Sequence, residues 1–127
     1  MRGVPDRLAE NGRMKVRGTL KKNSDFRRLY NRGKSAVTPH MVLYCRRSGS
    51  SVNRFGFTVS TKLGHAVVRN RVRRRLREVV RLNAGSVKTG YDIVIVARTR
   101  CINAKFSHIE QDYLAACRKL GLMRDEG

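Results

Sequence analysis

A dense run of arginines in the middle of the chain carries the clearest chemical signal. Its members, six arginines within nine residues and one embedded asparagine, are Arg69, Asn70, Arg71, Arg73, Arg74, Arg75 and Arg77. Like charges four residues apart repel each other on a helix, so this run destabilises an isolated helix. We expect a dense anionic surface to compensate for that repulsion. Guanidinium groups suit phosphate because their planar forks form paired hydrogen bonds with its oxygens.

The whole chain, like the arginine run, is strongly basic. Its 127 residues include 29 Lys and Arg against 9 Asp and Glu, a formal net charge of +20. Such a charge opposes a compact fold unless a polyanion neutralises it, and displacing counterions from a phosphate backbone favours binding. An anionic membrane surface would attract the same charge, so composition alone leaves that partner open. The length fits one domain, and an apolar content of 40% is sufficient for a modest core.

Two aromatic residues near the start of the chain offer a different chemistry. Phe26 and Tyr30 are four residues apart and have basic residues at positions 21, 22, 27 and 28 around them. Aromatic rings among basic residues can stack on unpaired bases, at about 1–3 kcal/mol per base. An aromatic pair on one face of an amphipathic helix is also a common core feature. Their spacing alone therefore leaves both interpretations open.

Tyr44 and the segment before the arginine run offer two further contacts. Tyr44 lies in an apolar stretch, where it either packs in the core or borders a groove floored by the small residues between 56 and 60. Lys62 precedes an expected helix start, whose free N–H groups can hold an anion. An ordinary strand-to-helix turn explains residues 60–65 equally well. His65 is better explained as a residue of this turn than as a catalytic residue.

The sequence lacks the groups of a protein catalyst. It contains no P-loop, no zinc-protease motif and no nucleophile elbow, and its nine acidic residues are scattered. A nuclease normally needs carboxylates on metal ions or an acid–base pair. The histidines show no metal-ligand spacing, and we interpret Cys45, Cys101 and Cys117 as reduced thiols, two of them in the core.

The chain shows no membrane or export signal. No apolar run approaches the ~20 residues that a membrane-spanning helix needs. The basic N-terminus is not followed by the apolar segment of a signal peptide. We therefore expect a soluble, cytoplasmic protein. A basic helix that binds membranes or calmodulin is an alternative, but its apolar face lacks aromatic residues and is expected to pack on a sheet.

Helical periodicity positions the arginine run. Helical spacing over 66–82 places one set of apolar side chains together and the arginines opposite; this set is Val68, Val72, Leu76, Val79 and Val80. Arg75 projects close to the apolar side and receives no role. Cap residues and Gly33 predict a helix at about 24–31, and apolar spacing predicts another at 105–120.

Three extended segments complete the pattern. We expect strands at 41–45, at 55–60 and at 91–97, the last with four consecutive branched residues that are typical of a central strand covered on both faces. The order α-β-β-α-β-α predicts one two-layer α/β sandwich with a sheet of three or four strands. We expect residues 1–19 to be a flexible basic arm and residues 121–127 a polar tail.

Three segments, in this order, resemble the bacterial ribonuclease P protein family. They are residues 20–26 (LKKNSDF) with Gly33 after them, residues 59–74 (VSTKLGHAVVRNRVRR) and residues 90–98 (GYDIVIVAR). The second is the most specific because it contains the Arg-Asn-Arg motif of the family. The resemblance covers residues 20–120, which would form the domain between the arm and the tail.

The resemblance implies a fold like the second domain of ribosomal protein S5. This is an α/β (α+β) two-layer sandwich of order α-β-β-(β)-α-β-α with a left-handed βαβ crossover. The handedness comes from the resemblance alone, because about 98% of such crossovers are right-handed.

The resemblance also implies two binding surfaces. One is a cleft for the single-stranded 5′ leader of precursor tRNA, lined by Lys22, Phe26, Tyr30, Tyr44 and Ser60. The other faces the catalytic RNA and consists of Lys62, Arg69, Asn70, Arg71, Arg73, Arg74 and Arg77. The chain departs from the family at Thr61, where Lys is frequent, and at Arg73, which replaces Lys and keeps the charge.

The implied reaction is divided between two partners. The RNA subunit binds Mg²⁺ and hydrolyses the phosphodiester bond, while the protein is non-catalytic and binds both that RNA and precursor tRNA. We expect one protein per catalytic RNA and no role for DNA or a membrane. The alternative is a ribosomal or other structural RNA-binding protein, which would not need an aromatic groove beside the arginine helix. A stand-alone nuclease is the least supported class, since catalytic groups are missing.

Overall fold

A five-stranded sheet forms the centre of this computed structural model, which describes residues 16–19 and 23–124. The strands lie in the order β1-β4-β5-β3-β2. β5 runs parallel to β4 and antiparallel to β3, while β1 pairs with β4 and β2 with β3 at the two edges. The bounds are β1 Val16–Thr19, β2 Lys34–Val37, β3 Met41–Arg47, β4 Asn53–Thr58 and β5 Tyr91–Ala97.

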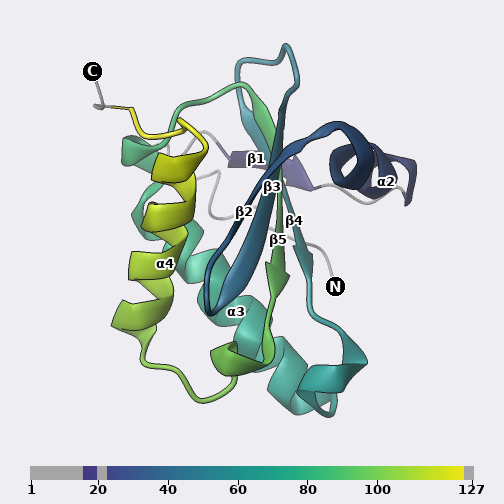
Figure 1. Ribbon diagram of the computed structural model, residues 1–127, viewed down its shortest axis with the longest axis vertical. Coiled ribbons are helices and arrows are strands. Elements are labelled where there is room, and N and C mark those ends of the chain that lie inside the picture. Colours follow the sequence, from purple (N-terminus) through teal and green to yellow (C-terminus); the bar gives the residue numbers. More distant parts are fainter. Residues whose placement is uncertain (1–15, 20–22, 125–127) are drawn as a thin grey trace.

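Helices cover the two faces of the sheet unequally. α3 (Ala66–Leu82) and α4 (Phe106–Lys119) pack side by side on one face, and α2 (Asn23–Arg32) lies against the other (Figure 1). The main core fills the space under α3 and α4. A smaller cluster lies under α2. Because α2 is short, part of its sheet face is left without a covering helix.

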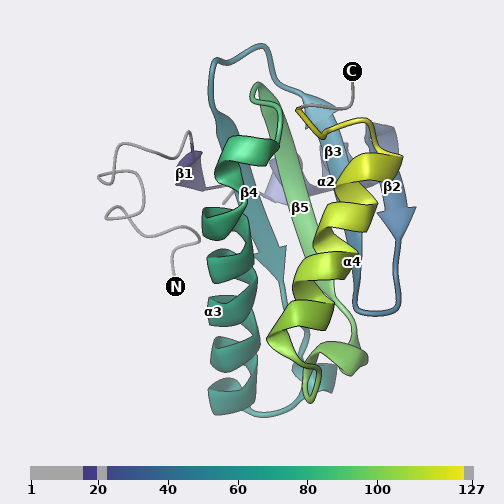
Figure 2. The ribbon, with the colours of Figure 1, turned by 90° about the vertical axis from the view of Figure 1, so that its left-hand side faces the viewer.

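The chain passes from β4 through α3 to the neighbouring parallel strand β5 by a left-handed crossover. Figure 2 shows the helices in front of the sheet, both strands running downward, and β5 to the right of β4. This handedness is opposite to the usual one. It confirms the expectation that rested on the family resemblance.

The strongest sequence patterns gave correct elements. Helix α3 and strand β5 have the predicted bounds, and Val72, Leu76, Val79 and Val80 of α3 are buried. Ile93 and Ile95 face the main core while Val94 lies under α2, all three fully buried. β5 is therefore a central strand covered on both faces, as its run of branched residues predicted.

Three segments differ from the expectation. Residues 16–19, placed in the flexible arm, form β1, whereas the rest of that arm lies outside the described residues. Local patterns did not predict β2, but it is the additional strand in the order α-β-β-(β)-α-β-α that the resemblance implies; with β1 the sheet has five strands rather than three or four. Residues 121–124 do not behave as a polar tail, because Leu122 is fully buried and its carbonyl accepts a hydrogen bond from Lys88 N. Edge pairing uses backbone groups and leaves little apolar periodicity, which explains why the local sequence pattern did not predict β1 or β2.

Candidate nucleic-acid interface

An aromatic cluster lies between α2 and the open face of the sheet. Tyr30 of α2 meets Tyr44 of β3 edge to face, with 4.9 Å between ring centroids, and Phe26 lies 6.4 Å from Tyr30. Leu29 anchors α2 by packing, fully buried, against Val94. Phe26 and Tyr44 are half-buried, and Tyr30 is 39% exposed. The rings are thus held by the core without being enclosed in it.

The floor of this cluster comes from β4 and β5. Tyr30 Oη lies 3.2 Å from Thr58 Oγ1 at the end of β4. Val96, half-buried on β5 and paired in register with Thr58, packs against the same small core. Gly56 has no side chain to fill the space beside Val94 on the neighbouring strand. The predicted small-residue floor is present at Thr58 and Gly56, whereas Val96 was not foreseen, although period-2 alternation along 91–97 places it on this face.

The other two residues predicted for this cleft are Lys22 and Ser60. Lys22 lies outside the described residues. Ser60 is exposed beyond the end of β4, where its Oγ accepts a hydrogen bond from Lys62 N at 3.0 Å and caps the short helix Thr61–Leu63. This geometry gives Ser60 a structural role in the turn.

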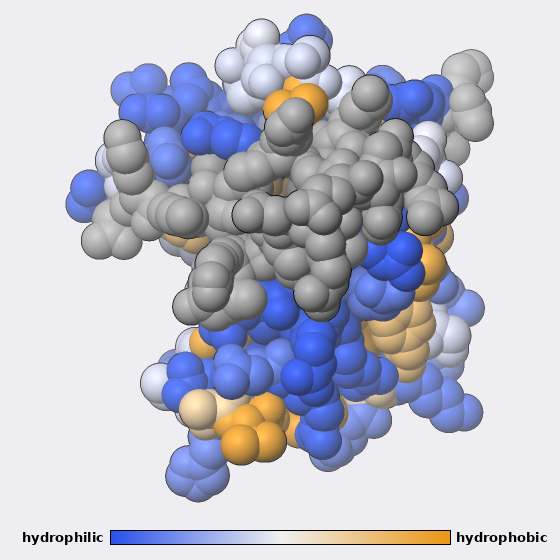
Figure 3. All heavy atoms as spheres, turned by 180° about the vertical axis from the view of Figure 1, so that it is seen from behind, coloured by the Kyte–Doolittle hydropathy of each residue, from blue (hydrophilic) through white to orange (hydrophobic). Residues whose placement is uncertain are grey.

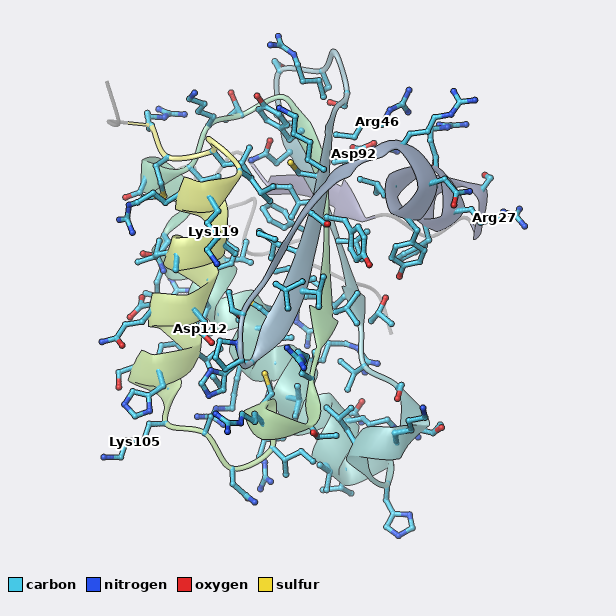
Figure 4. All side chains as sticks on the ribbon, in the orientation of Figure 1. Arg27, Arg46, Asp92, Lys105, Asp112 and Lys119 are labelled. Atoms are coloured by element: carbon cyan, nitrogen blue, oxygen red, sulfur yellow. The ribbon has the colours of Figure 1, made fainter. Side chains whose placement is uncertain are left out.

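A carboxylate that the sequence interpretation passed over organises the same face. Asp92 of β5 lies between Arg46 of β3 and Arg54 of β4 in register, on the side of the sheet that α2 covers (Figure 4). Arg54 donates to Asp92 from Nε at 2.9 Å and from Nη2 at 2.7 Å. These hydrogen bonds raise the pKa of Arg54 above its ordinary value. Asp92 thereby fixes one guanidinium group beside the aromatic cluster.

The arginine run forms the outer side of α3. Asn70, Arg71 and Arg74 are exposed, while Arg69, Arg73 and Arg77 are partly buried. Arg73 Nη1 donates to Asn70 Oδ1 at 3.0 Å, which confirms that these two side chains share a face. Figure 3 views the molecule from the side of α3 and β1 and shows hydrophilic residues gathered over its lower half. A long cationic surface is therefore available to a polyanion.

The turn between β4 and α3 connects the two surfaces. Arg69 Nε donates to Gly64 O at 3.1 Å, and Lys62 is exposed in the short helix that precedes Gly64. Gly64 has φ 138°, and a Cβ there would lie 3.2 Å from Val68 Cβ, so the turn requires glycine. The rings and the arginines thus lie on opposite sides of the sheet, and residues 58–64 link them. The sequence interpretation placed an aromatic groove beside the arginine helix; the rings and the arginines instead form two surfaces on opposite faces of the sheet, which meet at the end of β4.

Arg75 differs from its neighbours. Its Nη2 donates to Ala104 O at 2.7 Å, which ties α3 to the segment before α4. This contact explains why an arginine stands close to the apolar side of the helix.

The described residues offer no cluster of metal ligands, and their cysteines are buried. No group of three or more His, Cys, Asp or Glu in this part of the chain could hold a metal ion. Cys45, Cys101 and Cys117 are free and buried, all three rather than two in the core. Burial raises the pKa of Cys101 to about 11 and that of Cys117 to about 12, so neither is a nucleophile at neutral pH. No helix in the described ranges is long and apolar enough to cross a bilayer.

Comparison with known proteins gives a consistent result. A family model described as Ribonuclease P matches residues 14–121. The protein named "Ribonuclease P protein component" from Alkaliphilus oremlandii is 44% identical over 110 residues, which cover 87% of this chain and 96% of the relative. Its namesake from Alkaliphilus metalliredigens is 42% identical over 110 residues, covering 87% and 99%.

Solved structures agree with the sequence relatives. The RNase P protein from Staphylococcus aureus superposes with a TM-score of 0.75 at 28% identity, covering 84% of this chain and 97% of that one. The RNase P protein from Thermotoga maritima gives a TM-score of 0.75 at 29% identity, covering 81% and 97%.

Proposed function

The chain belongs to the ribonuclease P protein family, the protein subunits of a ribonucleoprotein endoribonuclease, and from this premise we propose how its two surfaces divide the binding of RNA. The aromatic cluster of Phe26, Tyr30 and Tyr44 binds the single-stranded 5′ leader of precursor tRNA. The outer side of α3 binds the catalytic RNA. The protein itself contributes no catalytic group.

The observation that carries the leader-binding role is the partial exposure of the rings. A ring that only served the core would be closed off, as Tyr113 is at 1% exposure. Tyr30 instead keeps 39% of its surface open while Tyr44 and Thr58 hold it in place. A fixed, half-open ring can stack on a base at little cost in side-chain entropy. Arg54, oriented by Asp92, presents its remaining N–H donors beside the rings to the leader phosphates.

The role of α3 follows from its charge. Asn70, Arg71 and Arg74 are exposed, and Arg73 is positioned by Asn70. These side chains offer forked donors to phosphate and one amide to a ribose or a base edge. Lys62, Arg69 and Arg77 extend the surface along the turn and the helix.

Mg²⁺ enters this proposal through the RNA. The family implies an RNA partner, and the described residues offer no metal site of their own. A cationic surface that neutralises crowded phosphates reduces the electrostatic cost of packing the RNA, which lowers the Mg²⁺ concentration needed for activity. We place the protein in the cytoplasm, where precursor tRNAs of bacteria are made.

Reconstitution tests the proposal. The full chain is added to a bacterial ribonuclease P RNA, and cleavage of precursor tRNA is followed at an Mg²⁺ concentration at which the RNA alone is slow. Stimulation that gives a mature 5′ end is expected, whereas protein without RNA should leave the precursor intact. An absence of stimulation with ribonuclease P RNAs of each architecture would exclude the proposed role.

A further inference from the structure

A basic hollow lies at the end of the sheet remote from the turn that leads into α3. It measures about 380 Å³ and is lined by Arg47, Lys88, Thr89, Tyr91 and Arg124. This volume lies within the range of small-ligand sites. Arg47 and Tyr91 pair in register on β3 and β5, whereas Thr58 pairs with Val96 at the other end of β5. Five residues of strand, ~17 Å, therefore separate the hollow from the end of β4.

The chemistry of the hollow is that of an anion site. Three of its five lining residues are cations, and Thr89 and Tyr91 add hydroxyl donors. Among the residues that the structure describes, no ion pair involves Arg47, Lys88 or Arg124. Three like charges in one hollow repel each other, and binding an anion relieves that repulsion.

The backbone around the hollow is held in place by a buried side chain. Asn53 is 4% exposed; its Nδ2 donates to Lys88 O at 2.9 Å, and its Oδ1 accepts from Tyr91 N at 2.8 Å. Lys88 N donates to Leu122 O at 2.7 Å, and Arg124 N donates to Ser86 O at 2.8 Å. Three separate parts of the chain are thus fixed around one space. Such preorganisation lowers the cost of binding.

We propose that this hollow binds a backbone phosphate of RNA, as a contact separate from the arginine side of α3 and from the aromatic cluster. The inference rests on the proposed function for the identity of the polyanion. The phosphate belongs either to the catalytic RNA or to precursor tRNA, and both offer the same group. Arg47 and Arg124 supply forked donors, and Lys88 supplies a point charge.

The first test compares variants that lose equal charge. Lys88→Ala/Arg124→Ala removes two cations from the hollow, and Lys105→Ala/Lys119→Ala removes two exposed lysines near and on α4 that do not line it (Figure 4). Each lost phosphate contact reduces the slope of log affinity against log salt by about 0.7–0.9. Because the hollow is proposed to hold one phosphate, we expect its variant to lose about 0.7–0.9 from the slope for the ribonuclease P RNA complex, or for its ternary complex with precursor tRNA. The control variant should lose much less.

The two complexes identify the source of the phosphate. A reduced slope already in the binary complex assigns it to the catalytic RNA, and a reduction that needs precursor tRNA assigns it to that substrate. Equal slopes for hollow and control variants in both complexes would overturn the proposal. If the double variant unfolds, Lys88→Glu provides the test, because this side chain is exposed and its backbone contacts are unchanged.

The second test uses inorganic phosphate as the probe. Titration of the full chain should shift the amide NMR signals of Thr89 and Gly90 in the wild type and much less in Lys88→Ala/Arg124→Ala. Shifts at the hollow combined with unchanged RNA slopes would mean an adventitious ion only, and the RNA contact would be rejected. If the wild type fails to stimulate the catalytic RNA, the proposed function fails, and this titration still decides whether the hollow binds phosphate.

Discussion

The ring of Tyr30 rests edge to face on the ring of Tyr44, with 4.9 Å between their centroids. One ring belongs to α2 and the other to β3, so this contact joins the helix to the open face of the sheet. Leu29 on the same helix is buried against Val94, and Tyr30 is consequently held at a fixed height above the floor formed by Thr58 and Val96.

Replacing an aromatic ring should weaken precursor tRNA binding selectively. Phe26→Ala removes a half-buried ring, and the loss of one stacked base is worth about 1–3 kcal/mol, or roughly tenfold in affinity. We expect the dissociation constant of the holoenzyme to rise about tenfold for precursor tRNA and to remain near the wild-type value for mature tRNA. Tyr30→Phe is the matched control, since it removes only the hydroxyl that contacts Thr58. An equal loss of affinity for both tRNAs would indicate that Phe26 serves core packing and does not bind the leader.

Removing charge from α3 should weaken binding of the catalytic RNA and make it less dependent on salt. For Arg73→Ala/Arg77→Ala, we expect the slope of log affinity against log salt to fall by about 1.5, since each phosphate contact contributes about 0.7–0.9. Filter binding or fluorescence anisotropy over a range of salt concentrations measures this slope. Lys105→Ala, which changes an exposed lysine away from α3, serves as the control. An unchanged slope in the double variant would show that this side of the helix does not contact phosphate.

Arg75 should affect stability rather than RNA binding. Its guanidinium group donates to Ala104 O at 2.7 Å and is partly buried. Hydrogen bonds from charged groups contribute about 1.5–3 kcal/mol, and partial exposure places Arg75→Ala at the lower end. We expect a loss of about 1.5 kcal/mol in the free energy of unfolding measured with urea. The salt slope of RNA binding should change less than in Arg73→Ala. A slope change as large as that of Arg73→Ala, together with unchanged stability, would contradict the structural role.

Acid should weaken the contact between α4 and the turn before β3. His40 Nδ1 lies 2.5 Å from Asp112 Oδ2, and His40 N donates to the same oxygen at 3.1 Å. Burial of the carboxyl group opposes its ionisation, but the hydrogen bonds from His40 outweigh burial and hold the pKa of Asp112 below its ordinary value. A depressed folded pKa means that this stabilisation is present above about pH 4 and is lost as the pH falls through the folded pKa.

Asp112→Asn tests this pH dependence. The variant cannot ionise, so its free energy of unfolding should fall less steeply than that of the wild type between about pH 4 and pH 2. Urea unfolding at several pH values gives the two curves. Parallel curves would mean that Asp112 does not contribute to acid sensitivity.

The buried thiols should be unreactive in the folded protein. Burial raises the pKa values of Cys45, Cys101 and Cys117, so little thiolate exists at neutral pH. We expect a thiol reagent at pH 7.5 to modify all three cysteines in denaturant and none at a comparable rate in buffer. Fast modification of the native protein would indicate local opening around α4 or β3.

Local sequence patterns predicted the elements that position the site. The features that they did not predict depend on pairing between strands far apart in the sequence. The amphipathic spacing of α3 and the branched run of β5 are local properties, and both elements have the predicted bounds. β1 joins the sheet by pairing with β4, more than 30 residues later, which no local pattern reports. The left-handed passage from β4 to β5 belongs to the same class, because periodicity carries no information about handedness.

The candidate site follows the same division. Helical spacing placed Phe26 beside Tyr30 and Asn70 beside Arg73, and the structure confirms both neighbourhoods. The contact of Tyr30 with Tyr44 and the pairing of Arg54 with Asp92 require knowledge of which strands are neighbours. A lone aspartate such as Asp92 is uninformative in the sequence, although it fixes a guanidinium group in the fold.

The central position of β5 has a consequence for synthesis of the chain on the ribosome. Its two neighbours, β3 and β4, are translated first but do not pair with each other, since β5 lies between them. Neither face of the sheet can close until Ala97 has left the exit tunnel, and the main core also needs Tyr113 and Leu122. The nascent polypeptide therefore remains open until nearly all of it has been made, with its cationic segments free to meet RNA before the domain is complete.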